Sequence, residues 1–153
     1  MNDKFPSLNL PFVNLRIRKV DDKTKVWDSL RSKYVVLTPE EYVRQHFTEY
    51  LISYLGYPRG LMGNEVSLEI NGMQRRCDTL ISDRTGKPFM VVEYKAPNVV
   101  ITQQVFDQIA RYNLAVGAEY LVVTNGNTHY CCKINKDSTY SFIPEIPPYP
   151  SSS

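Results

Sequence analysis

The chain has 153 residues, which fits one domain of ordinary size that can bury a hydrophobic core without disulfide or metal staples. Apolar residues make up 42% and charged residues 22%, as in soluble globular proteins, and no apolar run approaches the roughly 18 residues of a membrane helix. The net charge of +2 is too small to indicate nucleic-acid binding by itself. Because the opening sequence MNDKFPSLNLPF lacks the apolar stretch of a signal peptide, we expect a cytoplasmic protein with no membrane partner.

The cysteines and histidines do not indicate a metal site. Cys77 stands alone and Cys131 and Cys132 are adjacent, so there is no C-x-x-C pair of the kind that binds zinc. An odd number of cysteines without a secretion signal favours reduced thiols. His46 and His129 are far apart and have no ligand-like neighbour, so we expect structural or surface roles for both.

The N-terminal part of the chain predicts extended structure. Residues 13–20 alternate apolar and charged side chains, which is typical of a half-buried strand. The turn-like residues 21–24 follow, and residues 25–37 are again extended. We therefore expect a hairpin over residues 13–37.

A helix is predicted to begin at Thr38. Thr38 can cap it, Pro39 suits its first position, and Glu41 lies three residues after the cap, as in a capping box. Gly56 is expected to end the helix just after Leu55. The predicted buried stripe, at three- and four-residue spacing, consists of Val43, Phe47, Tyr50, Leu51 and Tyr54.

The middle of the chain predicts a hairpin followed by a central strand. The Asn-Gly pair at 71–72 is a strong hairpin signal between the extended segments 64–70 and 73–82. After a turn, residues 88–95 are apolar on both faces until Glu93, as in a strand buried on both sides.

The C-terminal part predicts one more helix and further strands. The helix is expected over 102–116, ending at Gly117, with a stripe made of Val105, Ile109, Tyr112 and Val116. The expected strands are 119–124, 127–134 and an edge strand at 139–143. The Pro- and Ser-rich tail, 144–153, is expected to be extended or disordered. This order predicts an α/β (α+β) sandwich with a central mixed β-sheet flanked by helices, in a single domain over residues 1–143.

Three charged residues in the centre form a plausible metal site. Asp78 lies in the second arm of the Asn-Gly hairpin, and Glu93 and Lys95 lie near the end of the next strand. Residues two apart on a strand share a face, so Glu93 and Lys95 point the same way. Two carboxylates suit a hard cation such as Mg²⁺, which activates water and polarises phosphate, and a lysine can orient that water or stabilise negative charge. The competing interpretation is a solvated Glu93–Lys95 ion pair without catalysis.

The sequence "Arg-Arg-Cys-Asp78-Thr-Leu-Ile … Phe-Met-Val-Val-Glu93-Tyr-Lys95" resembles the PD-(D/E)XK nuclease signature, with Cys77 in place of the proline. Gln108-Ile-Ala-Arg-Tyr112 resembles the Q-x-x-x-Y motif that follows it in the subset related to type I restriction enzymes. The segments Thr38–Gln45, Leu55–Pro58 and Thr124–Gly126 are also similar to the N-terminal nuclease domain of type I restriction R subunits. The similarity covers about residues 33–135, which we take as the core of the domain.

The resemblance implies a restriction-endonuclease-like fold, DNA as substrate and Mg²⁺ as cofactor, with Mn²⁺ able to substitute. It implies that Asp78 and Glu93 are metal ligands and Lys95 the catalytic lysine. Gln108 and Tyr112, four apart on one helix face, would support the site or touch DNA. Core packing and a solvated helix face are the alternatives for Tyr112 and Gln108, respectively.

Further residues are candidates for the same site. Members of the superfamily often carry an additional acid, for which Glu41 and Glu65 are candidates, although the capping box also explains Glu41. Arg76 and Arg111 are the candidate DNA-binding residues. The other basic residues near the site are Arg75, Arg84 and Lys87, and a second basic cluster consists of Arg16, Arg18 and Lys19. Exposed charges of this kind are often only solvated.

The function expected from these features is that of a Mg²⁺-dependent DNA endonuclease domain. The chain has no G-x-x-x-x-G-K-[ST] phosphate loop, so separate motor or specificity subunits are expected partners. A homodimer is a further expectation, because one such site cuts one strand. Two alternatives stay open: a catalytically idle nuclease-fold module that binds DNA or a protein, and a scaffold in which Glu93 and Lys95 form an ion pair.

Overall fold

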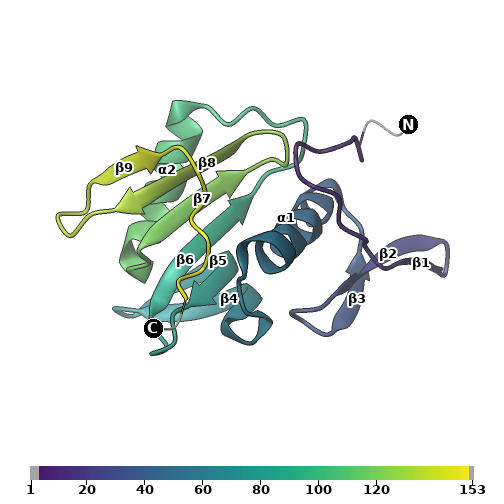
Figure 1. The fold of residues 1–153 in the computed structure, drawn as a ribbon, viewed down its shortest axis with the longest axis horizontal. Coiled ribbons are helices and arrows are strands. Elements are labelled where there is room, and N and C mark those ends of the chain that lie inside the picture. The colour runs from purple at the N-terminus through teal and green to yellow at the C-terminus, as the bar shows by residue number, and fades with distance from the viewer. Residues whose placement is uncertain (1–3, 152–153) are drawn as a thin grey trace.

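The computed structural model describes residues 4–151, which form two β-sheets and two α-helices (Figure 1). The first three residues of the segment inspected for a signal peptide, and residues 152–153 of the predicted tail, lie outside the described residues. No helix within residues 4–151 is long and apolar enough to cross a membrane.

The N-terminal sheet has three antiparallel strands rather than the two of the predicted hairpin. Its strands are β1 (Ile17–Val20), β2 (Lys23–Asp28) and β3 (Lys33–Val36). The second expected segment is interrupted because the Asp28 carboxylate accepts hydrogen bonds from the backbone N–H groups of Leu30 (2.8 Å) and Arg31 (3.1 Å). These bonds stabilise a turn in place of a continuous strand.

The segment before β1 is fastened along helix α1 (Pro39–Leu55) and onto the main sheet. Two helix tyrosines donate hydrogen bonds to it, Tyr42 to the Pro6 carbonyl (2.8 Å) and Tyr54 to the Phe12 carbonyl (2.9 Å). Further along, the Asn9 N–H donates to the Gly126 carbonyl at 2.9 Å. The N-terminal segment is therefore held at several points between the two sheets.

Helix α1 has the predicted ends but a narrower buried stripe. Thr38 Oγ1 accepts the Glu41 N–H at 3.1 Å, and Gly56 closes the helix with a left-handed φ of 75°, a conformation that costs glycine little. Phe47 and Leu51 are fully buried, but Tyr54 is 53% exposed, so its assignment to the stripe was wrong. The return bond expected of a capping box is not made, because the Glu41 side chain binds arginines instead.

The main sheet has six strands in the order β4-β5-β6-β7-β8-β9. Strands β6 and β7 are parallel and joined by helix α2, whereas all other neighbours are antiparallel. The elements are η1 (Arg59–Leu61), β4 (Met62–Ile70), β5 (Met73–Ser82), β6 (Pro88–Tyr94), α2 (Gln103–Asn113), η2 (Leu114–Val116), β7 (Tyr120–Thr124), β8 (His129–Ile134) and β9 (Tyr140–Ile143). The Asn-Gly hairpin, the central strand and the edge strand are confirmed.

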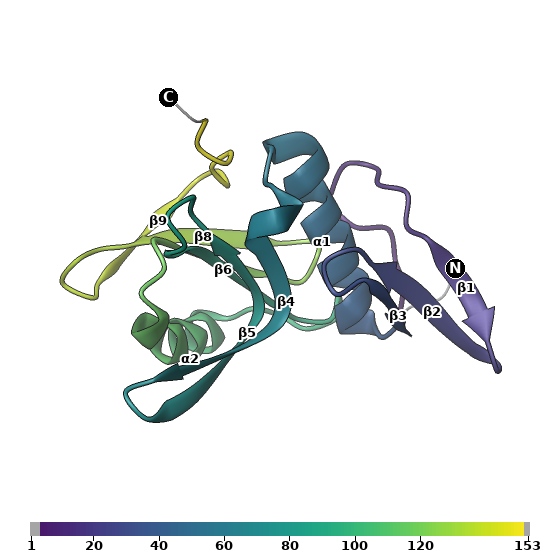
Figure 2. The same ribbon diagram turned by 90° about the horizontal axis from the view of Figure 1, so that it is seen from below.

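The two helices cover opposite faces of this sheet (Figure 2). On one face Phe47 of α1 packs in a cluster with Met90 and Val92 of β6. On the other, Phe106 of α2 packs in a cluster with Val91 of β6. Burial of β6 on both faces explains its continuous apolar run, and the predicted α/β sandwich with a mixed central sheet is confirmed.

The predicted stripe of α2 is confirmed in part, because Val116 is buried and Val105 and Ile109 pack against the same cluster, but the most buried residues of the helix are others. Phe106, Ala110 and Asn113 are buried, whereas Tyr112 is 41% exposed. Both sets recur with helical spacing, so the pattern alone did not distinguish them. The small Ala110 lies in the buried cluster beneath the helix, a place that a tyrosine could not occupy without moving the helix away from the sheet.

Residues 144–151 of the Pro/Ser-rich tail form neither helix nor strand, but part of this segment packs on the domain. Tyr149 is buried and lies 5.3 Å from the Tyr57 ring and 5.4 Å from the Phe89 ring, measured between centroids. Its N–H donates to the Leu55 carbonyl (2.9 Å) and its hydroxyl to the Ser82 carbonyl (3.0 Å). The tail therefore contributes to the hydrophobic core, which its composition did not indicate.

We expect Tyr149→Ala to lower the free energy of unfolding by about 3 kcal/mol, because it removes a buried aromatic ring. Tyr149→Phe keeps the ring and should cost only about 1 kcal/mol, the worth of one hydrogen bond. Urea denaturation of both variants measures these values. Unchanged stability in Tyr149→Ala would show that the tail is not anchored.

Candidate functional site

Asp78 and Glu93 lie side by side on the neighbouring strands β5 and β6. Thr79 pairs with Val92, and the same antiparallel register continued by one residue places Asp78 opposite Glu93. The Asp78 carboxylate accepts the backbone N–H of Tyr94 at 2.9 Å, which fixes its side chain over the end of β6. The structure thus brings together the two carboxylates that the sequence predicted to converge.

The Glu93 carboxyl is held in an environment that opposes its ionisation. Burial raises the pKa of Glu93 to about 9, and the neighbouring Asp78 carboxyl adds to this effect. Its Oε1 atom is buried and has no hydrogen-bond partner within residues 4–151. Two ionised carboxylates cannot donate hydrogen bonds to each other, so this pair requires a shared proton or a cation.

Lys95 directly follows β6. Its N–H donates to the Thr124 carbonyl at 2.9 Å, so the strand pairing continues beyond Tyr94 and Lys95 faces the same side of the sheet as Glu93. Among the described residues Lys95 forms no ion pair with Glu93 or Asp78. The ion pair that the scaffold alternative requires is therefore not formed.

A cavity of about 190 Å³ opens beside Glu93. It is lined by Arg76, Glu93, Gln108, Ile109, Tyr112 and Asn113. Gln108 and Tyr112, the residues of the Q-x-x-x-Y motif, therefore lie on one wall of the same cavity. The Tyr112 hydroxyl accepts the backbone N–H of Arg76 at 3.1 Å, and the Arg75 guanidinium lies 4.8 Å from the Tyr112 ring centroid. Tyr112 therefore braces β5 against α2 rather than packing in the core.

Asn113 is a site residue that the sequence analysis missed. It is 1% exposed, and its Nδ2 donates to the Ile109 carbonyl at 2.9 Å. Its Oδ1 is buried and has no partner within the described residues. The Asn113 side chain lowers the pKa of the Glu93 carboxyl, which opposes the larger increase caused by burial and by Asp78. The available signal was a polar residue at the helical spacing of Phe106 and Ala110.

The carboxylate oxygens of Glu41 are both engaged in hydrogen bonds of a structural network. Its two carboxylate oxygens accept hydrogen bonds from Arg31 (2.7 Å), from Arg44 (2.8 and 2.9 Å) and from Gln45 (3.0 Å). Burial alone would raise the pKa of Glu41, but the bonds from Arg44 and Gln45 outweigh burial and lower it. Four accepted bonds occupy the ligand-binding lone pairs, so the structure does not support Glu41 as a metal ligand.

Glu65 lines a small cavity together with Asp78, but it also pairs with arginines. Its oxygens lie 2.9 Å from Arg44 Nη2 and 2.7 Å from Arg76 Nε. The backbone of Glu65 has a left-handed φ of 55°. Within residues 4–151 no group of three or more Asp, Glu, His or Cys side chains is arranged to hold a metal ion, so neither additional acid joins Asp78 and Glu93.

Arg44 connects this network to the backbone of the candidate site. Its Nη1 donates to the Asp78 carbonyl oxygen at 3.0 Å. A second chain of bonds reaches the same place: Asn64 donates to Asp28 (2.9 Å), and the Thr79 hydroxyl bonds Asn64 (2.6 Å) and the Tyr94 hydroxyl (2.9 Å). The residues on either side of the carboxylate pair are thus fixed from the α1 face.

The predicted basic residues divide into two groups. Arg76 lines the cavity and Arg111 is exposed on α2. Arg84 and Lys87 lie instead in the β5–β6 turn, where Arg84 donates to the Pro150 carbonyl at 2.8 Å and stacks on Tyr149. Their placement near the site was wrong, because residues 79–82 of β5 and 88–92 of β6 lie between this turn and the carboxylates.

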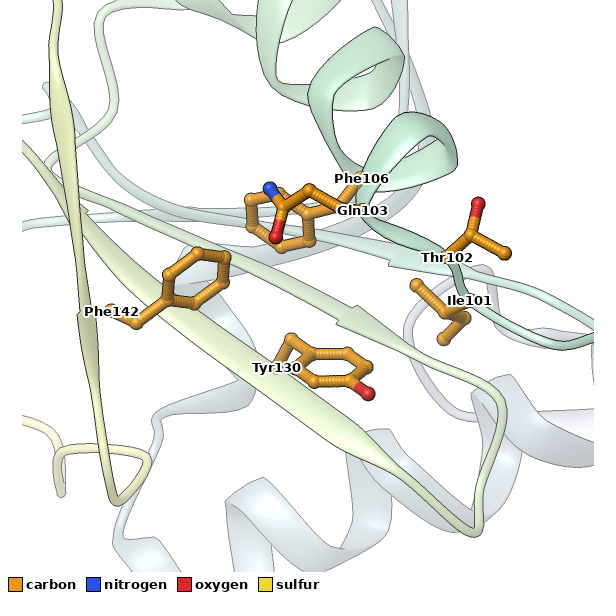
Figure 3. A pocket seen from close by; sticks show the side chains of 6 residues that line it. All are labelled: Ile101, Thr102, Gln103, Phe106, Tyr130 and Phe142. Atoms are coloured by element: carbon orange, nitrogen blue, oxygen red, sulfur yellow. The ribbon is translucent and has the colours of Figure 1, made fainter.

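The remaining candidates have structural roles. All three cysteines are buried and unpaired, and burial, with Glu93 and Asp78 nearby, raises the pKa of Cys77 to about 12. His129 bonds Thr124 Oγ1 (2.7 Å) and the Asn9 carbonyl (2.9 Å). A separate small cavity of about 70 Å³ has aromatic walls and no titratable side chain other than that of Tyr130 (Figure 3).

We expect Glu93→Gln to change stability in a pH-dependent way. The folded-state pKa of about 9 exceeds the ordinary value of 4.5, so the stability contributed by the Glu93 proton is complete below about pH 4.5 and is lost as the pH rises through 9. The variant lacks this loss and should therefore gain stability relative to the parent protein between pH 5 and pH 8. Urea denaturation at both pH values measures the difference, with the half-exposed Glu119→Gln as control; equal differences at both pH values would contradict the assignment.

We expect Glu41→Gln to lower the free energy of unfolding by roughly 3 kcal/mol, because it leaves the buried Arg44 with the more exposed Glu65 as its one carboxylate partner in the described chain. Calorimetric Mg²⁺ titration of the folded variant should give the affinity of the parent protein. A large loss of Mg²⁺ affinity with unchanged stability would restore Glu41 as a ligand.

The fold and the paired carboxylates define the class of restriction-endonuclease-like α/β domains. The family model of the type I restriction enzyme R protein N terminus (HSDR_N) matches residues 39–147, well over half of the chain. The chain therefore belongs to this family.

Among solved structures, the chain resembles a fragment assigned as the HsdR subunit of a type I restriction enzyme from Vibrio vulnificus YJ016. The two are 20% identical with a TM-score of 0.51, and the match covers 72% of this chain but 24% of the other, which supports the fold alone. A cryo-EM structure of a DrdV–DNA complex matches with 16% identity and a TM-score of 0.42, over 67% of this chain and 10% of the other, a likeness too weak to carry an argument. No curated protein matches the chain.

Proposed function

We propose that the chain is a Mg²⁺-dependent DNA endonuclease domain of the PD-(D/E)XK type, which hydrolyses phosphodiester bonds. The observation that carries this proposal is the pairing of Asp78 and Glu93 on adjacent strands, with a buried Glu93 oxygen that has no partner in the described part of the chain. Family membership supports the same function.

The donor atoms fit a hard divalent cation. Asp78 and Glu93 supply carboxylate oxygens, the ligands that Mg²⁺ prefers, and Mn²⁺ accepts the same donors. Such ions commonly bind one or two carboxylates and complete their shell with water and phosphate oxygens, so a third acid is not required. When bound, Mg²⁺ would polarise the scissile phosphate and lower the pKa of a coordinated water.

The chain's own residues would orient the reactants. Lys95, on the Glu93 side of the sheet and without an ion-pair partner in the described chain, can donate hydrogen bonds to a water or a phosphate oxygen and oppose the negative charge that develops there. Asn113, which lines the same cavity, would help to position the Glu93 carboxyl. Arg76 and Gln108, which line the cavity, would contact DNA.

The proposal extends to partners. This chain spans 24% of the length of the HsdR fragment, so we propose that motor or specificity functions come from other subunits or domains. A site with one Asp78–Glu93 pair cuts one strand, so cleavage of both strands would use two copies of the chain.

A catalytically idle DNA-binding module is the second candidate. The observation that favours it is the arginine pairing of Glu65, which leaves two acids at the site within residues 4–151. It predicts DNA binding that Glu93→Ala does not weaken, and no cleavage in any metal.

We expect the purified chain to nick DNA with Mg²⁺ or Mn²⁺ and to be inactive with EDTA. Asp78→Ala removes a ligand, and Lys95→Ala removes the charge that stabilises the transition state, so each should lower the rate at least about 100-fold. Gel assays on single-stranded, duplex and branched DNA measure the rates. The exposed Lys136→Ala, which removes the same charge far from the site, should cleave like the parent protein.

The proposal fails if the folded protein leaves all three DNA forms intact in both metals. It also fails if Lys95→Ala and Lys136→Ala have equal rates, because the activity would then belong to a contaminant or to another site.

A further inference from the structure

The positive charge of the chain is concentrated in its N-terminal sheet. Residues 16–36 contain seven Lys and Arg residues and three Asp residues, which gives a net charge of +4. The whole chain has a net charge of +2, so the remainder carries −2. The family match begins at residue 39, so the sheet lies outside the segment that defines the family. It projects from the end of the molecule opposite β9 (Figures 1 and 2).

The strand register gathers cations and aromatic rings on one face of this sheet. Arg18 pairs with Lys25, Trp27 pairs with Tyr34, and Trp27 donates its N–H to the Arg16 carbonyl. Side chains alternate along strands, so these five residues share a face, which we call the basic face. The opposite face carries Val26 and Asp28, both fully buried.

The side chains of the basic face are held in position by one another. The Arg16 guanidinium lies 5.4 Å from the Trp27 ring centroid, and the Arg18 guanidinium lies 4.7 Å from the Tyr34 ring centroid. The two rings pack edge to face at 5.2 Å. Cation–π contacts order the guanidinium groups without neutralising them, so their hydrogen-bond donors stay available for an anion.

The cations of the basic face lack acidic partners. Within residues 4–151, Arg16, Arg18 and Lys25 form no ion pair with a carboxylate, unlike the arginines around Glu41. Arg16 and Arg18 are exposed. Arg18 is on β1 and Arg16 directly precedes it, so the two are two residues apart along extended backbone, about 6.7 Å, a spacing similar to that of successive phosphates on an extended nucleic-acid strand.

A cavity of about 240 Å³ continues from the basic face toward helix α1. Trp27 and Arg16 line it together with Asn14, Leu15, Ser29, Gln45, Glu49 and Arg59. An aromatic wall with polar amide and hydroxyl groups suits the stacking and hydrogen bonding of an unpaired base.

We propose that the basic face is a DNA-binding site separate from the Asp78–Glu93 site. Arg16 and Arg18 contact successive phosphates, Lys25, opposite Arg18 on β2, adds positive charge beside them, and the Trp27 cavity accepts a base where the DNA is single-stranded. The inference rests on the proposed function only for the choice of DNA as the nucleic acid, since binding here needs neither metal nor cleavage. An acidic protein surface would match the charge but would not use the aromatic cavity.

The experiment exploits Trp27, the sole tryptophan of the chain. The full chain is titrated in EDTA with a 20-nucleotide single strand, with the matching duplex and with polyglutamate, at several salt concentrations. Binding at the basic face should change the Trp27 fluorescence with both DNA forms, and polyglutamate of equal charge should bind more weakly. The slope of log affinity against log salt counts the phosphate contacts.

Arg16→Ala combined with Arg18→Ala should reduce that slope by about 2 for duplex and about 1.4 for single-stranded DNA. Replacement of both residues by lysine keeps the charges and should retain the slope. The control combines Lys133→Ala with Lys136→Ala, which removes the same charge at the other end of the molecule and should leave the slope unchanged.

The proposal is overturned if the Arg16/Arg18 double alanine variant, shown to be folded by its circular dichroism, binds DNA with the parent slope. Equal losses in the two alanine pairs, or stronger binding of polyglutamate than of DNA, would likewise overturn it. Normal binding at the basic face in a protein that never cleaves DNA would refute the nuclease proposal and leave this one standing. DNA cleavage in a protein whose DNA binding does not depend on Arg16 and Arg18 would refute this proposal and leave the nuclease proposal standing.

Discussion

The buried ion pair between Glu41 and Arg44 is the constraint on which the geometry of the candidate site depends. Both residues are about 7% exposed, and Arg44 reaches from α1 to Glu65 on β4 and to the Asp78 carbonyl on β5. Burying two charges costs much of what their attraction returns, so the pair is a weak source of stability. Its structural effect is to hold one helix and two strands in a single arrangement, because any displacement would leave a charge buried without a partner.

Order at the carboxylates follows from this arrangement. On the α1 face, polar bonds run through Thr79 and the Tyr94 hydroxyl, and the Tyr94 N–H bonds Asp78. On the α2 face, Asn113 and Glu93 line one cavity. The unfavourable proximity of the two carboxyls is thus imposed by the bonds on the α1 face and by the strand pairing. Strain concentrated at one place and supported from its surroundings is characteristic of functional sites.

Local chemistry determined what the sequence could predict. Thr38 and Gly56 marked the ends of α1 because capping depends on neighbouring backbone groups, and the Asn-Gly turn fixed the β4–β5 hairpin. The convergence of Asp78 and Glu93 could be predicted because side chains alternate along strands and because β6 pairs with β5 of that hairpin. The features that the sequence did not predict depend on residues far apart in the chain. The Glu41 carboxylate binds Arg31 instead of the N-cap backbone, and the Tyr149 ring packs beside Tyr57. Along α2 the pattern predicted the core contact of Val105 and Ile109, but the exposure of Tyr112 depends on how the helix lies on the sheet.

The fastening of residues 4–16 gives the N-terminal sheet a fixed place. One end of the sheet is tied through Pro6, Asn9 and Phe12 to α1 and the β7–β8 turn, and the other runs directly into Thr38 and the helix. The sheet is therefore not an arm on a flexible linker. The basic face and the Asp78–Glu93 pair would therefore keep a constant separation. A DNA strand bound at the basic face would meet the carboxylates a fixed number of nucleotides from that contact. The domain would then act as a ruler along its substrate.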